Sequence, residues 1–104
     1  MLNSTLVVQP NANTPDIAEA WNQRAISHFQ LREFDESIGD CHATLERNPF
    51  HFGAASGMGQ SYLELGYLQP ALASFERALT LNPGLDSVRR NVDVLTNGPA
   101  IQAI

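Results

Sequence analysis

Apolar residues recur at helical spacing in two stretches of the chain. Both stretches follow the pattern i, i+4, i+7, i+11. The first carries Phe34, Ile38, Cys41 and Leu45, and the second carries Leu68, Leu72, Phe75 and Leu79. At about 100° per residue, the four side chains of each stretch form one apolar stripe. The pattern therefore predicts two amphipathic helices with the same phase.

These stretches belong to a repeat with a period of 34 residues, closed by Asn48-Pro49 in the first copy and by Asn82-Pro83 in the second. The same shift pairs Ala20 with Ala54, Ser27 with Ser61, Leu31 with Leu65, and Leu45 with Leu79. A 34-residue period that ends in proline is typical of stacked helical hairpins.

We expect five helices, at about 15–31, 34–47, 51–65, 69–82 and 85–96. Thr14 is the predicted N-cap of the first, with Pro15 at its first position. Gly66 suits a left-handed turn after the third helix, and Gly98-Pro99 is expected to end the fifth. Residues 9–13 read as a linker. The predicted core contains Trp21, Ile38, Leu45, Met58, Tyr62, Leu72, Phe75 and Leu79.

The repeat units share a motif of aromatic and small residues. The first carries Trp21, Ala25, His28, Ser37, Cys41, Thr44 and Pro49, and the second carries Ala55, Gly59, Tyr62, Ala71, Phe75, Ala78 and Pro83. In these positions residues 18–83 resemble the tetratricopeptide repeat family. The first unit departs from the family pattern at Arg24, His28 and Cys41, which replace apolar or aromatic residues.

The resemblance implies an all-α fold, a right-handed superhelix of two helical hairpins plus a capping helix (an α-α solenoid). The expected organisation is a flexible N-terminal segment at 1–13, repeats at 14–49 and 50–83, a C-terminal capping helix at 84–96, and an apolar tail at 97–104. In helix 51–65, Gly59 is expected where the two helices of a hairpin approach closely.

Composition narrows the classes of partner. The 104 residues carry a net charge of −5, with six arginines and no lysine, so nucleic acid and anionic membranes are poor partners. The single cysteine excludes an internal disulfide and a cysteine-rich zinc site. No segment reaches the roughly 20 apolar residues of a membrane span. Since residues 1–8 do not form a convincing signal peptide, a cytoplasmic location is favoured, although the start could be cut from a longer protein.

Few residues suggest a catalytic or metal-binding role. The repeat pattern places His28 and Cys41 face to face, where an imidazole could activate a thiol. Alternatively, the two side chains fill the space that Tyr62 and Phe75 occupy in the second repeat. His42 points about 100° away from Cys41, which disfavours a shared metal. We expect no enzyme activity, no metal and no cofactor.

The resemblance implies a concave groove lined by the first helix of each hairpin. The expected binding residues are Glu19, Asn22, Gln23, Ile26, His51, Gly53, Ser56, Gly57, Gln60, Ser87, Arg90 and Asn91. This groove is polar and nearly uncharged, which disfavours the family's clamp for a chaperone-tail carboxylate. Gly53 and Gly57 lie four residues apart on one face of the helix. Either they form a flat strip that a partner can approach closely, or they only make the helix weak.

Two functions are open at this point. One is a protein-interaction scaffold that holds a peptide or a partner helix in the groove. The other is self-assembly as a homodimer, because two repeats leave apolar faces uncovered. The apolar segments Leu6-Val7-Val8 and Pro99 to Ile104 could cover such faces, on the same chain or on a neighbour.

Overall fold

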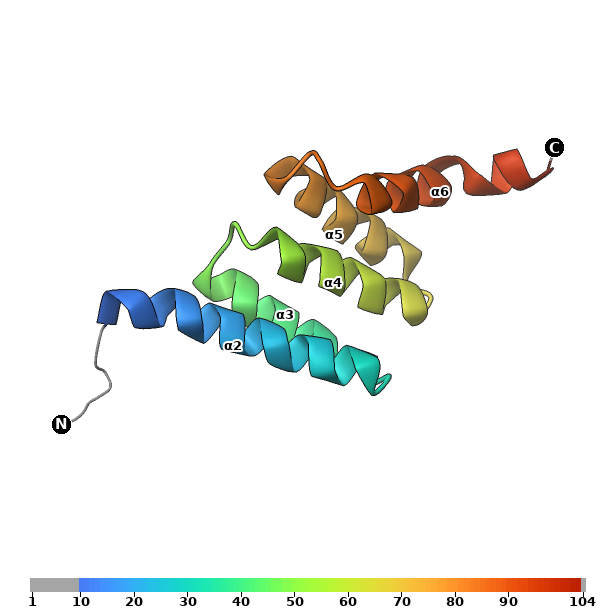
Figure 1. Ribbon diagram of the computed structural model, residues 1–104. Helices are drawn as coiled ribbons and strands as arrows, with labels where there is room; N and C mark the ends of the chain where they lie inside the picture. Colours follow the sequence, from blue (N-terminus) through green and yellow to red (C-terminus); the bar gives the residue numbers. More distant parts are fainter. Residues whose placement is uncertain (1–9, 104) are drawn as a thin grey trace.

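The computed structural model describes the backbone of residues 10–103 and the side chains of residues 17–98. Within them it contains five helices: α2 (Pro10–Gln30), α3 (Phe34–Arg47), α4 (Phe52–Glu64), α5 (Leu68–Leu81) and α6 (Asp86–Ala103). The helices stack in chain order, with α2 at one end and α6 at the other (Figure 1). Helices α2 and α3 form one hairpin, α4 and α5 form the second, and α6 packs on α5. This is the expected all-α helical repeat solenoid.

The internal helix ends follow the sequence signals. Gly66 has a φ of +81° and ends the turn after α4, as predicted. The equivalent position in the first repeat is Arg32, which adopts φ +62° without being glycine. Its guanidinium lies 5.1 Å from the centre of the Phe34 ring, and its Nη2 lies 3.5 Å from a carboxylate oxygen of Glu64. These contacts offset part of the cost of a left-handed conformation at a residue with a side chain.

The two outer helices are longer than predicted. Helix α2 begins at Pro10, so Thr14 lies inside the helix rather than at its N-cap, and residues 10–13 are helical rather than a linker. Helix α6 continues past Gly98-Pro99 to Ala103, because an internal proline removes one hydrogen bond without necessarily ending a helix. The segment Leu6-Val7-Val8 and Ile104 lie outside the described residues.

The core lies between the hairpins. Phe75 is completely buried, and the alanines of α4 and α5 allow the helices to approach. The buried cluster comprises Ala25, Cys41, Leu45, Ala54, Ala55, Met58, Ala71, Phe75, Ala78 and Val88. Of the predicted core, Leu45, Met58 and Phe75 are fully buried, while Ile38, Tyr62 and Leu79 are half-buried against the cluster.

The prediction was wrong for Trp21, which is only half-buried and lies outside the cluster. The guanidinium carbons of Arg24 and Arg47 lie 4.9 and 5.1 Å from its ring centre. No helix in the described part of the chain precedes α2, so nothing there covers this face. Leu72 is likewise half-buried rather than central to the core.

Candidate functional site

An open cleft of about 420 Å³ lies between α2 and α4, with α3 contributing its floor. It is lined by Asn22, Ala25, Ile26, Phe29 and Gln30 from α2, by Ser37 and Cys41 from α3, and by Gly53, Gly57 and Gln60 from α4. The first helices of both hairpins therefore line the cleft, as the sequence suggested. Such a volume lies within the range of about 300–1,000 Å³ that is usual for ligand clefts.

Three glycines shape α4 for different reasons. A Cβ atom at Gly59 would lie 2.6 Å from two atoms of the buried Phe75 ring, which confirms the expected close approach of α4 to α5. A Cβ atom at Gly53 would lie 3.2 Å from Cε1 of His51. At Gly57 it would meet only Sγ of Cys41, at 3.6 Å, which is an ordinary contact. The contact with Phe75 thus explains why residue 59 is glycine, and the contact with His51 limits the space at Gly53. A side chain at Gly57 would meet only an ordinary contact, so the glycine there leaves the cleft open.

The described residues that line the cleft include no charged side chain. Three amides, Asn22, Gln30 and Gln60, supply its polar groups, and each can both donate and accept hydrogen bonds. Asn22 is only 8% exposed. The hydroxyl of Ser37 donates to the backbone carbonyl of Ala25 at 2.8 Å, so it is already engaged at the floor.

Cys41 is buried at the floor of the cleft, and its thiol is held in the neutral form. Its pKa is raised to about 11, chiefly by burial and also by the nearby carboxylate of Asp40, while a hydrogen bond with Ser37 acts in the opposite direction. Because the thiolate is the reactive form of cysteine, this environment does not favour a nucleophile.

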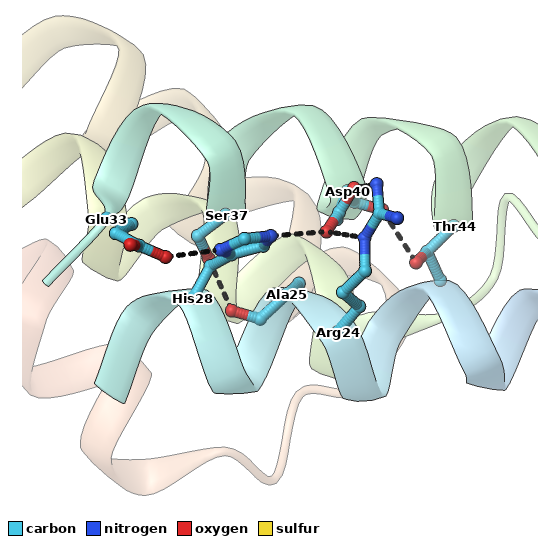
Figure 2. Close-up of polar contacts among 7 residues, drawn as sticks. All are labelled: Arg24, Ala25, His28, Glu33, Ser37, Asp40 and Thr44. Carbon is cyan, nitrogen blue, oxygen red and sulfur yellow. Dashed lines mark hydrogen bonds and ion pairs between the residues drawn. The ribbon is translucent and has the colours of Figure 1, made fainter. Parts of the chain in front are cut away.

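The ring of His28 lies between two carboxylates, so both of its nitrogens are directed at these groups and not at the thiol of Cys41 (Figure 2). Its Nδ1 is 2.7 Å from Oε1 of Glu33, and its Nε2 is 3.6 Å from Oδ2 of Asp40. Arg24 donates two hydrogen bonds to the same Asp40 carboxylate, at 2.8 and 3.0 Å. The polar residues that replace the family's apolar ones at 24 and 28 thus hold α2 on α3 through one buried aspartate.

Two polar side-chain contacts lie at the ends of the cleft, one at each end. Near the start of α4, Nε2 of His51 donates to Oε1 of Glu19 at 2.9 Å, while Nδ1 of the same ring accepts the Ala54 amide at 3.0 Å and caps the helix. At the other end Arg32 pairs with Glu64 at 3.5 Å. The hydrogen bond from His51, and then one from Gln23, lowers the pKa of Glu19. Both contacts join the first hairpin to the second across the cleft.

The twelve residues expected in the groove fall into three groups. Asn22, Ile26, Gly53, Gly57 and Gln60 line the cleft. Glu19 and His51 lie at its edge in the ion pair, Gln23 donates to Glu19 at 2.7 Å, and Ser56 is half-buried on α4. Ser87, Arg90 and Asn91 lie on α6 and are not among the lining residues.

Sequence reasoning missed half of the lining: Ala25, Phe29, Gln30, Ser37 and Cys41. Phe29 and Gln30 follow Asn22 and Ile26 at helical spacing, so the face of α2 could have been extended to them. Ser37 and Cys41 belong to a second helix, which the repeat pattern assigns to the core.

A second, shallower hollow of about 270 Å³ lies on the outer face of α2 and is lined by Ile17, Ala20, Trp21 and Arg24. Among the described residues, no set of three or more His, Cys, Asp or Glu side chains is placed to hold a metal ion. The helices of the same region also lack any segment long and apolar enough to cross a membrane.

Comparisons with known proteins agree with this architecture. The family model "Tetratricopeptide repeat" matches residues 55–85. A TPR repeat-containing protein of Rhizobium etli is 36% identical over 81 residues, which are 78% of this chain and 40% of that protein. Human superkiller complex protein 3 is 31% identical over 64 residues, 62% of this chain and 4% of its own length. The chain thus spans less than half the length of these relatives.

Solved structures show the same fold. The first TPR domain of Spaghetti (RPAP3), bound to an HSP90 peptide, has a TM-score of 0.75 at 24% identity and covers 80% of this chain and 66% of that one. The crystal structure of MamA has a TM-score of 0.77 at 19% identity, over 83% of this chain and 50% of that one. Together with the matched repeat, these similarities identify the chain as a tetratricopeptide repeat protein.

Proposed function

We propose that the chain is a protein–protein interaction module that binds a peptide or a partner helix in the cleft between α2 and α4. The cleft itself carries this proposal, because three helices converge on about 420 Å³ of mostly apolar space, which none of the described side chains fills at Gly57. The solved RPAP3 domains bound to HSP90 and HSP70 peptides support peptide binding by this fold.

The cleft does not favour a clamp for a terminal carboxylate. Such a clamp needs cations directed at the ligand, whereas Asn22, Ile26 and Gly57 occupy the cleft surface here. Arg24 and Arg32 are engaged by Asp40 and Glu64. We therefore propose a protein or peptide partner, without nucleic acid, a cofactor or a catalytic step.

Selection of peptides from a random phage-displayed library on the immobilised protein tests the proposal. The selected peptides are synthesised and titrated by calorimetry against the wild type and against Gly57→Leu, which fills the cleft. Gly39→Leu is the matched control, because Gly39 is exposed on α3 and nothing lies within 4 Å of its added Cβ.

We expect Gly57→Leu to abolish binding of the selected peptides and Gly39→Leu to leave it unchanged, with the same helical circular dichroism in both. Gln60→Arg, which places a cation at the cleft edge, should also lose binding. Peptides that bind all four proteins equally would place the site elsewhere.

Self-association as a homodimer is a second candidate, favoured by an outer face of α2 that no other helix among the described residues covers. A shift of 34 residues relates Ala20, Trp21 and Arg24 to Ala54, Ala55 and Met58, which are all buried between helices. In the first repeat the equivalent face is open, and Ile17 beside it is 49% exposed.

Sedimentation at increasing concentration tests this second candidate. An interface of roughly 10 μM affinity would be mostly occupied near 100 μM protein. We expect a dimer that Ile17→Glu dissociates and that Leu31→Glu, a matched change at another exposed apolar residue, leaves intact. A wild-type monomer that persists near 100 μM would reject the candidate.

A further inference from the structure

We infer that the cleft selects an uncharged peptide segment that places one leucine-sized aliphatic side chain over Gly57 and against Cys41. This inference rests on the proposed function, because it names the chemistry of the ligand at the same site. Three features of the cleft support it: the shape above Gly57, the distribution of charge around the cleft, and the amides along it.

The cleft owes its shape to Gly57, which has no side chain. Gly57 leaves open the position from which a Cβ atom would contact Sγ of Cys41 at 3.6 Å. Ala25, Ile26 and Phe29 of α2 line the same cleft, and Ile26 remains 43% exposed. An aliphatic side chain entering from solvent would therefore be surrounded by carbon and sulfur atoms. Burial of such a side chain removes apolar surface from water and therefore favours binding.

The charges exclude an acidic ligand. The lining residues offer no cation, so a carboxylate placed in the cleft would lose water without gaining an ion pair, which disfavours its binding. At the two ends of the cleft, Glu19 accepts a hydrogen bond from His51, and Glu64 is paired with Arg32. An anionic segment would approach the Glu19 carboxylate and be repelled, whereas an uncharged segment meets no such barrier.

The amides suit a peptide backbone beside the anchor. Asn22, Gln30 and Gln60 lie along the cleft, and each can pair with an N–H or a C=O group. The Nδ2 group of Asn22 is 3.5 Å from Oε2 of Glu19, a long contact that a peptide carbonyl could replace. Peptide groups on both sides of an aliphatic side chain thus find partners without any charged group.

The test uses three capped tripeptides that differ in one side chain: acetyl-Gly-Leu-Gly-amide, acetyl-Gly-Ala-Gly-amide and acetyl-Gly-Asp-Gly-amide. Each is titrated into the full chain labelled with ¹⁵N, and the amide shifts are followed by NMR. We expect saturable shifts at the amides of Ala25, Gly53 and Gly57 with the leucine peptide. Its affinity should exceed those of the alanine and aspartate peptides by about tenfold or more. Gly57→Leu should remove these shifts, and Gly39→Leu should retain them.

The outcomes separate the inference from the proposed function. Absence of saturable shifts with the leucine peptide, or equal binding of the aspartate peptide, would overturn the apolar anchor. If library peptides bind through an acidic residue and still lose binding to Gly57→Leu, the proposed interaction module is supported and the proposed ligand class is rejected. Failure of every selected peptide to respond to Gly57→Leu would instead reject the cleft as the site.

Discussion

Replacing Gly59 by alanine tests the close approach of the two helices in the second hairpin. The added Cβ would lie 2.6 Å from Cδ1 and Cε1 of Phe75, whereas carbon atoms in good contact are about 3.5–4.0 Å apart. Phe75 is completely buried, so its ring has little room to move by the required distance of about 1 Å. Overpacking of this kind typically costs about 1–3 kcal/mol.

The same substitution also has a favourable part. Alanine stabilises a helix interior relative to glycine by about 0.5–1 kcal/mol. Gly39→Ala isolates this part, because nothing lies within 4 Å of its added Cβ. We expect Gly39→Ala to raise the free energy of unfolding by about 0.5–1 kcal/mol, and Gly59→Ala to lower it by about 1–2 kcal/mol.

Urea unfolding followed by circular dichroism measures both changes, and a difference of 1 kcal/mol corresponds to about 4–8 °C in melting temperature for a domain near this size. Phe75→Leu should relieve the clash, so its effect combined with Gly59→Ala should be smaller than the sum of the single effects. Equal stability of Gly59→Ala and Gly39→Ala would refute the close approach.

Three further predictions concern buried polar and titrating groups. Ser61→Ala should leave stability unchanged or raise it by up to about 1 kcal/mol, since the buried Ser61 hydroxyl has no hydrogen-bond partner among the described residues. Ser37→Ala should lower stability by about 1 kcal/mol, and urea unfolding compares the two variants. The pKa of Cys41 is raised from 9.0 to about 11 in the folded protein, so its contribution to stability is present below pH 9 and is lost as pH rises through 11. Wild type should therefore lose more unfolding free energy than Cys41→Ala over that window, and an equal loss in both would contradict the buried thiol. The lowered pKa of Glu19 contributes stability above its ordinary value of 4.5 that is lost as pH falls, so the difference in melting temperature between wild type and Glu19→Gln should shrink below pH 4.5; a constant difference would count against this ion pair.

The internal helices could be predicted from the sequence because two independent signals coincide there. The 34-residue period covers α3, α4 and α5, the apolar stripes also mark α3 and α5, and packing on both sides reinforces all three helices. The outer ends depended on local signals alone. Thr14-Pro15 and Gly98-Pro99 are compatible with helix termini, yet the helical backbone continues through both.

The candidate site was harder to predict than the fold. The family pattern brings Asn22 and Gly57 to one surface, but it says nothing of a floor built by the second helix of the hairpin, where Cys41 lies. Apolar character alone placed Trp21 in the core, although burial also requires a helix to cover it. The Arg24–Asp40 pair joins residues 16 positions apart, and the apolar pattern could not show their contact.

The order in which the helices pack also bears on how the protein opens and folds. Each helix contacts mainly its neighbours in the chain, and α6 packs chiefly on α5. Local unfolding can therefore begin at one end and stop at a helix boundary, without breaking the rest of the stack. Amide hydrogens of α6 are expected to exchange with solvent before those of α3 and α4, and because most contacts are local, the chain should fold rapidly.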